Sequence, residues 1–82
     1  MERMSARFVG NVVGKSAKWV YALWEEMGIV TKDKLGDWIL TDAGKEIGGK
    51  MSRNNYCPVP TFDFEVIEKL MIDFYNKHHM KN

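Results

Sequence analysis

The sequence predicts one small domain, spanning residues 1–82, that is mainly α with a small antiparallel β-hairpin. Apolar residues recur at helical spacing in the stretches 5–28, 42–51 and 63–79. At 29–41, a β-branched run and an apolar run flank a polar segment that contains a glycine, which is typical of a hairpin. The chain is 45% hydrophobic and 28% charged, which is ordinary for a globular protein with a single modest core.

The stretch 5–28 predicts two short helices joined by a tight turn at 14–15. The apolar faces of these helices consist of Phe8, Val9, Val12 and Val13 in the first and Val20, Leu23, Trp24 and Met27 in the second. Ser5 and Ser16 are placed to cap the two helices, and Gly28 is placed to end the second with a positive φ. Two short helices that meet across a glycine turn are the outline of a helix-turn-helix.

The first helix contains a glycine, and the residues before it lack a pattern. Gly10 lowers the stability of the helix by about 1 kcal/mol relative to alanine. A glycine at such a position most often lets a neighbouring backbone come close, and we expect that role here. Met1 to Met4 are predicted as a frayed lead-in.

Residues 29–41 predict the β-hairpin. Ile29 to Thr31 are β-branched, Lys32 to Asp37 are polar, and Trp38 to Thr41 are apolar again. Gly36 supplies the positive φ that such turns need. A hairpin that directly follows a helix-turn-helix is a wing.

The rest of the chain predicts a helix at 42–51, an extended segment at 52–62 and a C-terminal helix at 63–79. Gly44, Gly48 and Gly49 weaken the helix at 42–51, so either packing holds it or it ends near Gly48. The segment 52–62 contains both prolines and has no periodicity, so we expect it to cross the surface with Tyr56 and Val59 turned inward. The last helix begins with acidic residues and ends with basic ones, which matches the helix dipole. Its apolar face consists of Ile67, Leu70, Met71, Phe74 and Tyr75, with Val66 at the edge.

The sequence gives no support for catalysis or metal binding. Residues 10–16 resemble a phosphate-binding P-loop, but three residues separate the glycines where that motif needs four, and no strand precedes it. Cys57, His78 and His79 lack the spacing of a metal site, since adjacent helical residues point about 100° apart. We therefore predict that the protein is not an enzyme and uses no cofactor or metal.

The predicted compartment is the cytoplasm. One cysteine excludes an internal disulfide framework and fits a reducing compartment. No apolar run approaches the roughly 18–20 residues that span a bilayer. The first ten residues also lack the apolar region of a signal peptide, so we expect no membrane partner.

The net charge is only +1, so a nucleic-acid surface must come from local segregation of charge. Most basic residues lie in the first two-thirds of the chain. The start of the second helix would meet base edges, and flanking lysines would meet phosphates. The residues predicted to bind DNA are Lys15, Ser16, Ala17, Lys18, Tyr21, Lys32 and Lys34. The alternative is a solvated surface whose lysines are offset by Glu25, Glu26, Asp33 and Asp37.

The order of helix, turn, helix and hairpin resembles a winged helix-turn-helix domain. The patterns that carry this resemblance are GKSAKWV at 14–20, MGIV at 27–30 and WILTDAG at 38–44. In winged-helix regulators a Leu-Thr-x-x-Gly segment follows the second wing strand and opens the next helix, as Leu40, Thr41 and Gly44 do here. The run from Gly36 to Gly49 also resembles small C-terminal domains of phage antirepressors and related mobile-element regulators.

The resemblance implies that residues 16–27 form the recognition helix and residues 32–37 the wing. Winged helices normally have another helix before the helix-turn-helix, whereas here only about four residues precede it. The C-terminal helix would fill that place in the core or pair with its copy in a dimer. A large aromatic residue, Trp19, also follows Lys18 on the recognition helix and is suited to packing on protein.

Two hypotheses of function follow. The first is a DNA-binding transcriptional or phage-type regulator, acting as a dimer on double-stranded DNA. The alternative is a winged-helix-shaped protein-interaction module, such as an antirepressor, inhibitor or accessory subunit, which the near-neutral charge and Trp19 favour. That alternative predicts an exposed apolar patch, from Trp19 or the C-terminal helix, larger than a monomer normally tolerates.

Overall fold

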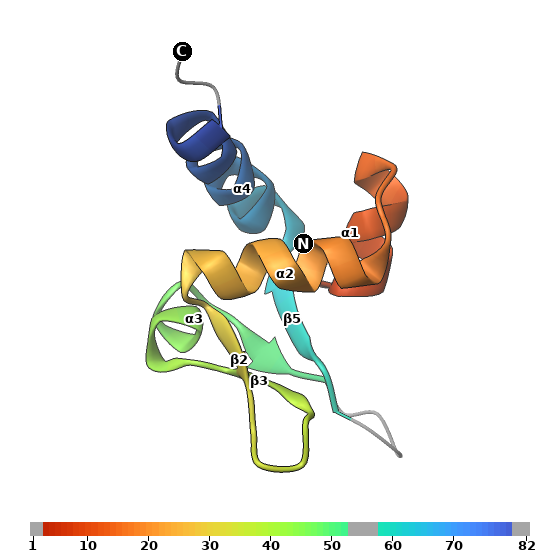
Figure 1. Cartoon of the computed structure of the whole chain (residues 1–82), viewed down its shortest axis with the longest axis vertical. Coiled ribbons are helices and arrows are strands. Elements are labelled where there is room, and N and C mark those ends of the chain that lie inside the picture. The colour runs from red at the N-terminus through yellow and green to blue at the C-terminus, as the bar shows by residue number, and fades with distance from the viewer. Residues whose placement is uncertain (1–2, 53–57, 80–82) are drawn as a thin grey trace.

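The computed structural model describes residues 3–52 and 58–79. In chain order the elements are β1 (Arg3–Ser5), α1 (Ala6–Val13), α2 (Ala17–Met27), β2 (Val30–Lys32), β3 (Trp38–Leu40), α3 (Asp42–Glu46), β4 (Lys50–Met51), β5 (Pro60–Asp63) and α4 (Phe64–His79). This part of the chain is a compact mix of helices and small antiparallel sheets, as predicted, although with more β-structure than the single predicted hairpin. Helix α2 crosses the middle of the molecule between α4 and the β2–β3 hairpin (Figure 1).

Helices α1 and α2 meet across the predicted tight turn. Gly14 adopts a left-handed φ of 76°, and the backbone N–H of Lys15 donates to the Gly10 carbonyl oxygen at 2.8 Å. A Cβ at Gly10 would lie 2.5 Å from the Lys15 carbonyl oxygen, which confirms that this glycine permits a close backbone approach. Ser16 caps α2 as predicted, because its hydroxyl accepts the Trp19 N–H at 3.1 Å.

The predicted hairpin is present, with β2 and β3 antiparallel. The paired residues are Val30 with Leu40, Thr31 with Ile39 and Lys32 with Trp38. Gly28, at a φ of 81°, ends α2 as predicted and leads into the hairpin. Asp33 organises the loop, because its carboxylate accepts the N–H groups of Leu35 and Asp37, each at 2.9 Å. Gly36 supplies the expected positive φ, of 85°.

The predicted helix at 42–51 is wrong in its second half. Helix α3 ends at Glu46, because Gly48 adopts a φ of 95°, which an α-helix cannot continue through. Residues 50–51 then form β4 instead of a last helical turn. Gly49 lies against the core, where a Cβ would be 2.6 Å from a ring carbon of Phe62.

A second sheet joins the two ends of the chain, in the strand order β1-β5-β4. Strand β5 corrects the predicted extended segment at 52–62 and includes Asp63, the predicted start of the last helix. Strand β1 corrects the predicted frayed lead-in, and Ser5 precedes α1 without a side-chain capping bond. Val59 is half-buried, while Tyr56 lies outside the described residues.

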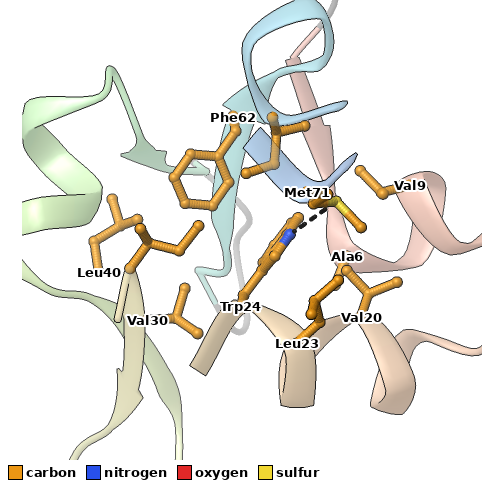
Figure 2. Close-up of a cluster of buried hydrophobic side chains, with 11 residues drawn as sticks. Ala6, Val9, Val20, Leu23, Trp24, Val30, Leu40, Phe62 and Met71 are labelled. Carbon is orange, nitrogen blue, oxygen red and sulfur yellow. Dashed lines mark hydrogen bonds between the residues drawn. The ribbon is translucent and has the colours of Figure 1, made fainter. Parts of the chain in front are cut away.

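The core is centred on Trp24, whose indole is fully buried between α4, β5 and the hairpin (Figure 2). Its ring meets that of Phe62 edge-on, at a centroid distance of 4.8 Å, and its Nε1–H donates to the Met71 sulfur at 3.3 Å. The other buried apolar residues are Ala6, Val9, Val20, Leu23, Ile29, Val30, Leu40 and Ile67. Helix α4 therefore enters the core through its first half.

Candidate nucleic-acid interface

The turn before α2 and the first residues of the helix hold four of the predicted DNA-binding residues. Lys15, Ser16 and Lys18 are exposed, whereas Ala17 is half-buried and packs against the core. The Lys15 ammonium nitrogen lies 5.3 Å from the centroid of the Trp19 ring, which is a cation–π distance. This end of α2 therefore presents two cations to solvent.

Helix α2 has two exposed flanks with different neighbours. Residues three or four apart on a helix share a side, so Lys18 lies between Tyr21 on one flank and Ala22 on the other. The flank of Tyr21 faces the hairpin, because Tyr21 contacts Trp38. The flank of Ala22 lines a groove shared with α4, and Trp19 lies on this flank.

An aromatic stack joins α2 to the hairpin. The rings of Tyr21 and Trp38 are parallel within 5°, with centroids 4.8 Å apart, and Tyr21 also meets Trp24 edge-on at 5.9 Å. The Lys32 ammonium nitrogen lies 5.1 Å from the Trp38 centroid. Helix and hairpin are therefore held in one relative orientation, with a cation beside the stack.

The hairpin loop carries Lys34 at an exposed position next to Leu35, whose side chain is 86% exposed. The carboxylate of Asp33 accepts hydrogen bonds from two backbone N–H groups of the loop. The backbone N–H of Asp33 also donates to the Asp37 carbonyl oxygen at 2.9 Å. Such a network holds a loop in one conformation before a partner binds. Little conformational entropy is then lost on binding. The tip of the hairpin is therefore preorganised.

The structure connects some of the predicted site residues and leaves others apart. Tyr21 and Lys32 both meet Trp38 in the stack, and Lys18 is exposed on α2 one helical turn before Tyr21. Lys15 is directed over Trp19, on the other flank of α2. Lys34 is exposed in the loop between β2 and β3.

Trp38 is the residue that sequence reasoning missed. It is predicted only as part of a strand, yet it contacts both Tyr21 and Lys32. The signal is the hairpin register, since a loop of five residues places Trp38 directly opposite Lys32. The loop length therefore predicts that the Trp38 ring and Lys32 form a cross-strand pair.

Among the described residues, no group of three His, Cys, Asp or Glu side chains is placed to hold a metal ion. Cys57 and the side chains of His78 and His79 lie outside what the structure describes. Within the same described ranges, each helix is too short or too polar to cross a membrane.

Comparison of the chain with protein-family models, with curated proteins and with solved structures finds no match.

Proposed function

We propose that this chain is a DNA-binding regulatory protein of the winged helix-turn-helix type, which contacts double-stranded DNA through α2 and the β2–β3 hairpin. The observation that carries the proposal is the stack of Tyr21 on Trp38. It fixes the hairpin beside α2, on which Lys18 is exposed one helical turn before Tyr21, so helix and hairpin can bind one duplex together. The single cysteine of the sequence supports the cytoplasm as the place of this activity.

In this proposal the N-terminal part of α2 approaches the major groove and Lys18 reaches base edges. Tyr21 offers its ring edge, because Trp38 covers one face of its ring. Ala17 contributes only contact area, since it is half-buried. The phosphate contacts come from Lys15, Ser16, Lys32 and Lys34.

The distribution of charge along α2 supports an approach by its N-terminal end. Lys15 and Lys18 lie at the start of the helix, and Glu25 and Glu26 lie in its last turn, all exposed. The positive end of the helix dipole lies at the same end as the lysines. Phosphates are therefore attracted to the start of α2 and repelled from its end.

The test is an NMR titration of labelled protein with a mixed-sequence duplex, at low and at near-physiological salt. We expect shifts confined to residues 15–21 and 32–38, with an affinity that falls steeply as salt rises, because counterions are released from the phosphates. Lys18→Glu should abolish binding and leave the fold intact. Lys69→Glu is the matched control, since it makes the same charge change at an exposed site on α4 and should bind like the wild type.

Unchanged DNA affinity in the Lys18→Glu variant, or equal losses in both variants, would contradict the proposed surface. No shifts at low salt would contradict DNA binding itself. That second outcome would favour a protein-interaction module, such as an antirepressor or accessory subunit. One observation supports this second function: Ile72 and Tyr75 on the C-terminal helix are 52% and 44% exposed.

A further inference from the structure

A groove of about 520 Å³ separates α1 from α4 on the flank of α2 that faces away from the hairpin. Its lining is mostly apolar. The α1 side contributes Val13 and Lys15, and the α4 side contributes Glu68, Ile72 and Tyr75. None of these five residues belongs to the stack of Tyr21 on Trp38, so the groove is a separate surface.

Exposed apolar side chains lie at this groove and on α1 outside it. Val13 on α1, which is 41% exposed, and Ile72 and Tyr75 on α4 line the groove. Phe8 and Val12 on α1 are outside the lining and are 59% and 55% exposed, so of the α1 face that the sequence predicts as core only Val9 is buried. Phe8 and Val12 are four residues apart, so they share one side of α1. An exposed apolar side of a helix marks an interaction surface.

The two sides of the groove carry opposite charges. Lys15 is the charged residue on the α1 side, Glu68 is the charged residue on the α4 side, and Glu26 of α2 also lines the groove. A two-fold axis places the α4 side of one molecule against the α1 side of another. The apolar residues then cover each other, and each lysine meets a carboxylate. This surface is therefore complementary to a copy of itself.

We infer that the groove is the surface through which two copies of this chain associate. Ile72 and Tyr75 of one copy pack on Phe8 and Val12 of the second copy, and Glu68 pairs with the second copy's Lys15. Each contact occurs twice because the interface is symmetric. The dimer leaves the Tyr21–Trp38 surface open on both copies, and it does not depend on DNA binding.

Sedimentation equilibrium of the wild-type chain without DNA tests the association, and a concentration-dependent dimer is expected. Ile72→Glu should raise the dimer dissociation constant by at least about 100-fold, since the charge enters an apolar interface twice. Val66→Glu is the matched control. Val66 is a similarly exposed apolar residue on α4, about 120° around the helix from Ile72, and we expect a change below about threefold. Circular dichroism of each variant checks that the helices are retained.

A charge swap tests the arrangement of the two copies. Lys15→Glu and Glu68→Lys should each weaken self-association, whereas a mixture of the two variants should form a mixed dimer with near wild-type affinity, because one ion pair is then the native one and the other is restored with reversed sign. A wild-type chain that stays monomeric at about 0.5 mM would overturn the inference. So would equal effects of Ile72→Glu and Val66→Glu, or a mixture that associates no better than either variant alone.

Discussion

Replacing Gly44 by alanine has two opposite effects on stability, a gain from higher helix propensity and a loss from overpacking. In a helix interior this change stabilises by about 1 kcal/mol. Here the new Cβ would run into the backbone carbonyl oxygen of Ile29, with the Ile29 carbonyl carbon and a Leu40 methyl carbon each 3.1 Å away. Two of these three neighbours are backbone atoms, so the penalty is at the upper end of the usual cost of overpacking, about 3 kcal/mol. The expected net loss is about 2 kcal/mol.

The backbone of Ile29 cannot easily retreat from the new methyl group. Its carbonyl oxygen accepts the Thr41 N–H at 3.2 Å, and the Thr41 hydroxyl donates to the Gly28 carbonyl oxygen at 2.6 Å and accepts the Gly44 N–H at 3.1 Å. These bonds tie the end of α2, the hairpin and α3 together. They also give a physical reason for the Leu-Thr-x-x-Gly pattern.

Thermal unfolding followed by circular dichroism measures the effect of Gly44→Ala. A loss of about 2 kcal/mol lowers the Tm of a domain of this size by about 8–16 °C. Lys45→Ala is the control, because Lys45 is exposed in the same short helix and should change the Tm by about 3 °C or less. A Tm for Gly44→Ala at or above the wild-type value would refute the reasoning, since propensity would then outweigh the close approach.

Three further predictions concern the core and the hairpin. Met71→Leu leaves the buried Trp24 N–H without its acceptor and should lower the free energy of unfolding, measured in urea, by about 1–3 kcal/mol. In a Trp24→Phe background, which has no N–H to satisfy, this loss should largely vanish. Asp33→Ala removes two hydrogen bonds to backbone N–H groups of the loop and should speed hydrogen exchange at residues 35–37, while Asp37→Ala leaves these acceptors in place and should not. Trp38→Ala removes the stack on Tyr21 and should cost about 1–2 kcal/mol and weaken DNA binding, whereas Trp38→Phe should retain most of both.

The pair of helices α1 and α2, the tight turn between them and the hairpin could be predicted because their signals are local. Gly14, Gly28 and Gly36 each take a positive φ, and Ser16 caps the next helix, so each boundary is decided within a few residues. The apolar spacing of α2 and α4 likewise predicts the buried residues that these two helices contribute to the core around Trp24, namely Val20, Leu23, Ile67 and Met71. Close approach at Gly10 follows from a glycine inside an apolar helix, and the structure confirms it.

The second sheet could not be predicted because its signals are distant. Arg3 pairs with Asp63 across nearly the whole chain, and strands of two to four residues have no periodicity of their own. Gly48 and Gly49 indicate a weak helix in the sequence. The close approach of Gly49 to the Phe62 ring, just before β4 begins, is visible only in the structure. In the candidate site the lysines are visible in the sequence. The stack of Tyr21 on Trp38 is harder to predict, because one must know both the register of the hairpin and which side of α2 faces the hairpin.

Lys15 lies where the two proposed surfaces meet, and this makes them separable by mutation. Its ammonium group rests over Trp19 at the mouth of the groove, and its backbone belongs to the turn that starts α2. Lys15→Glu should therefore reduce both DNA affinity and self-association. Lys18→Glu should reduce only DNA affinity, and Glu68→Lys only self-association. If Lys15→Glu and Lys18→Glu instead alter self-association equally, the two surfaces are not distinct, and the role of α2 as a boundary between them is wrong.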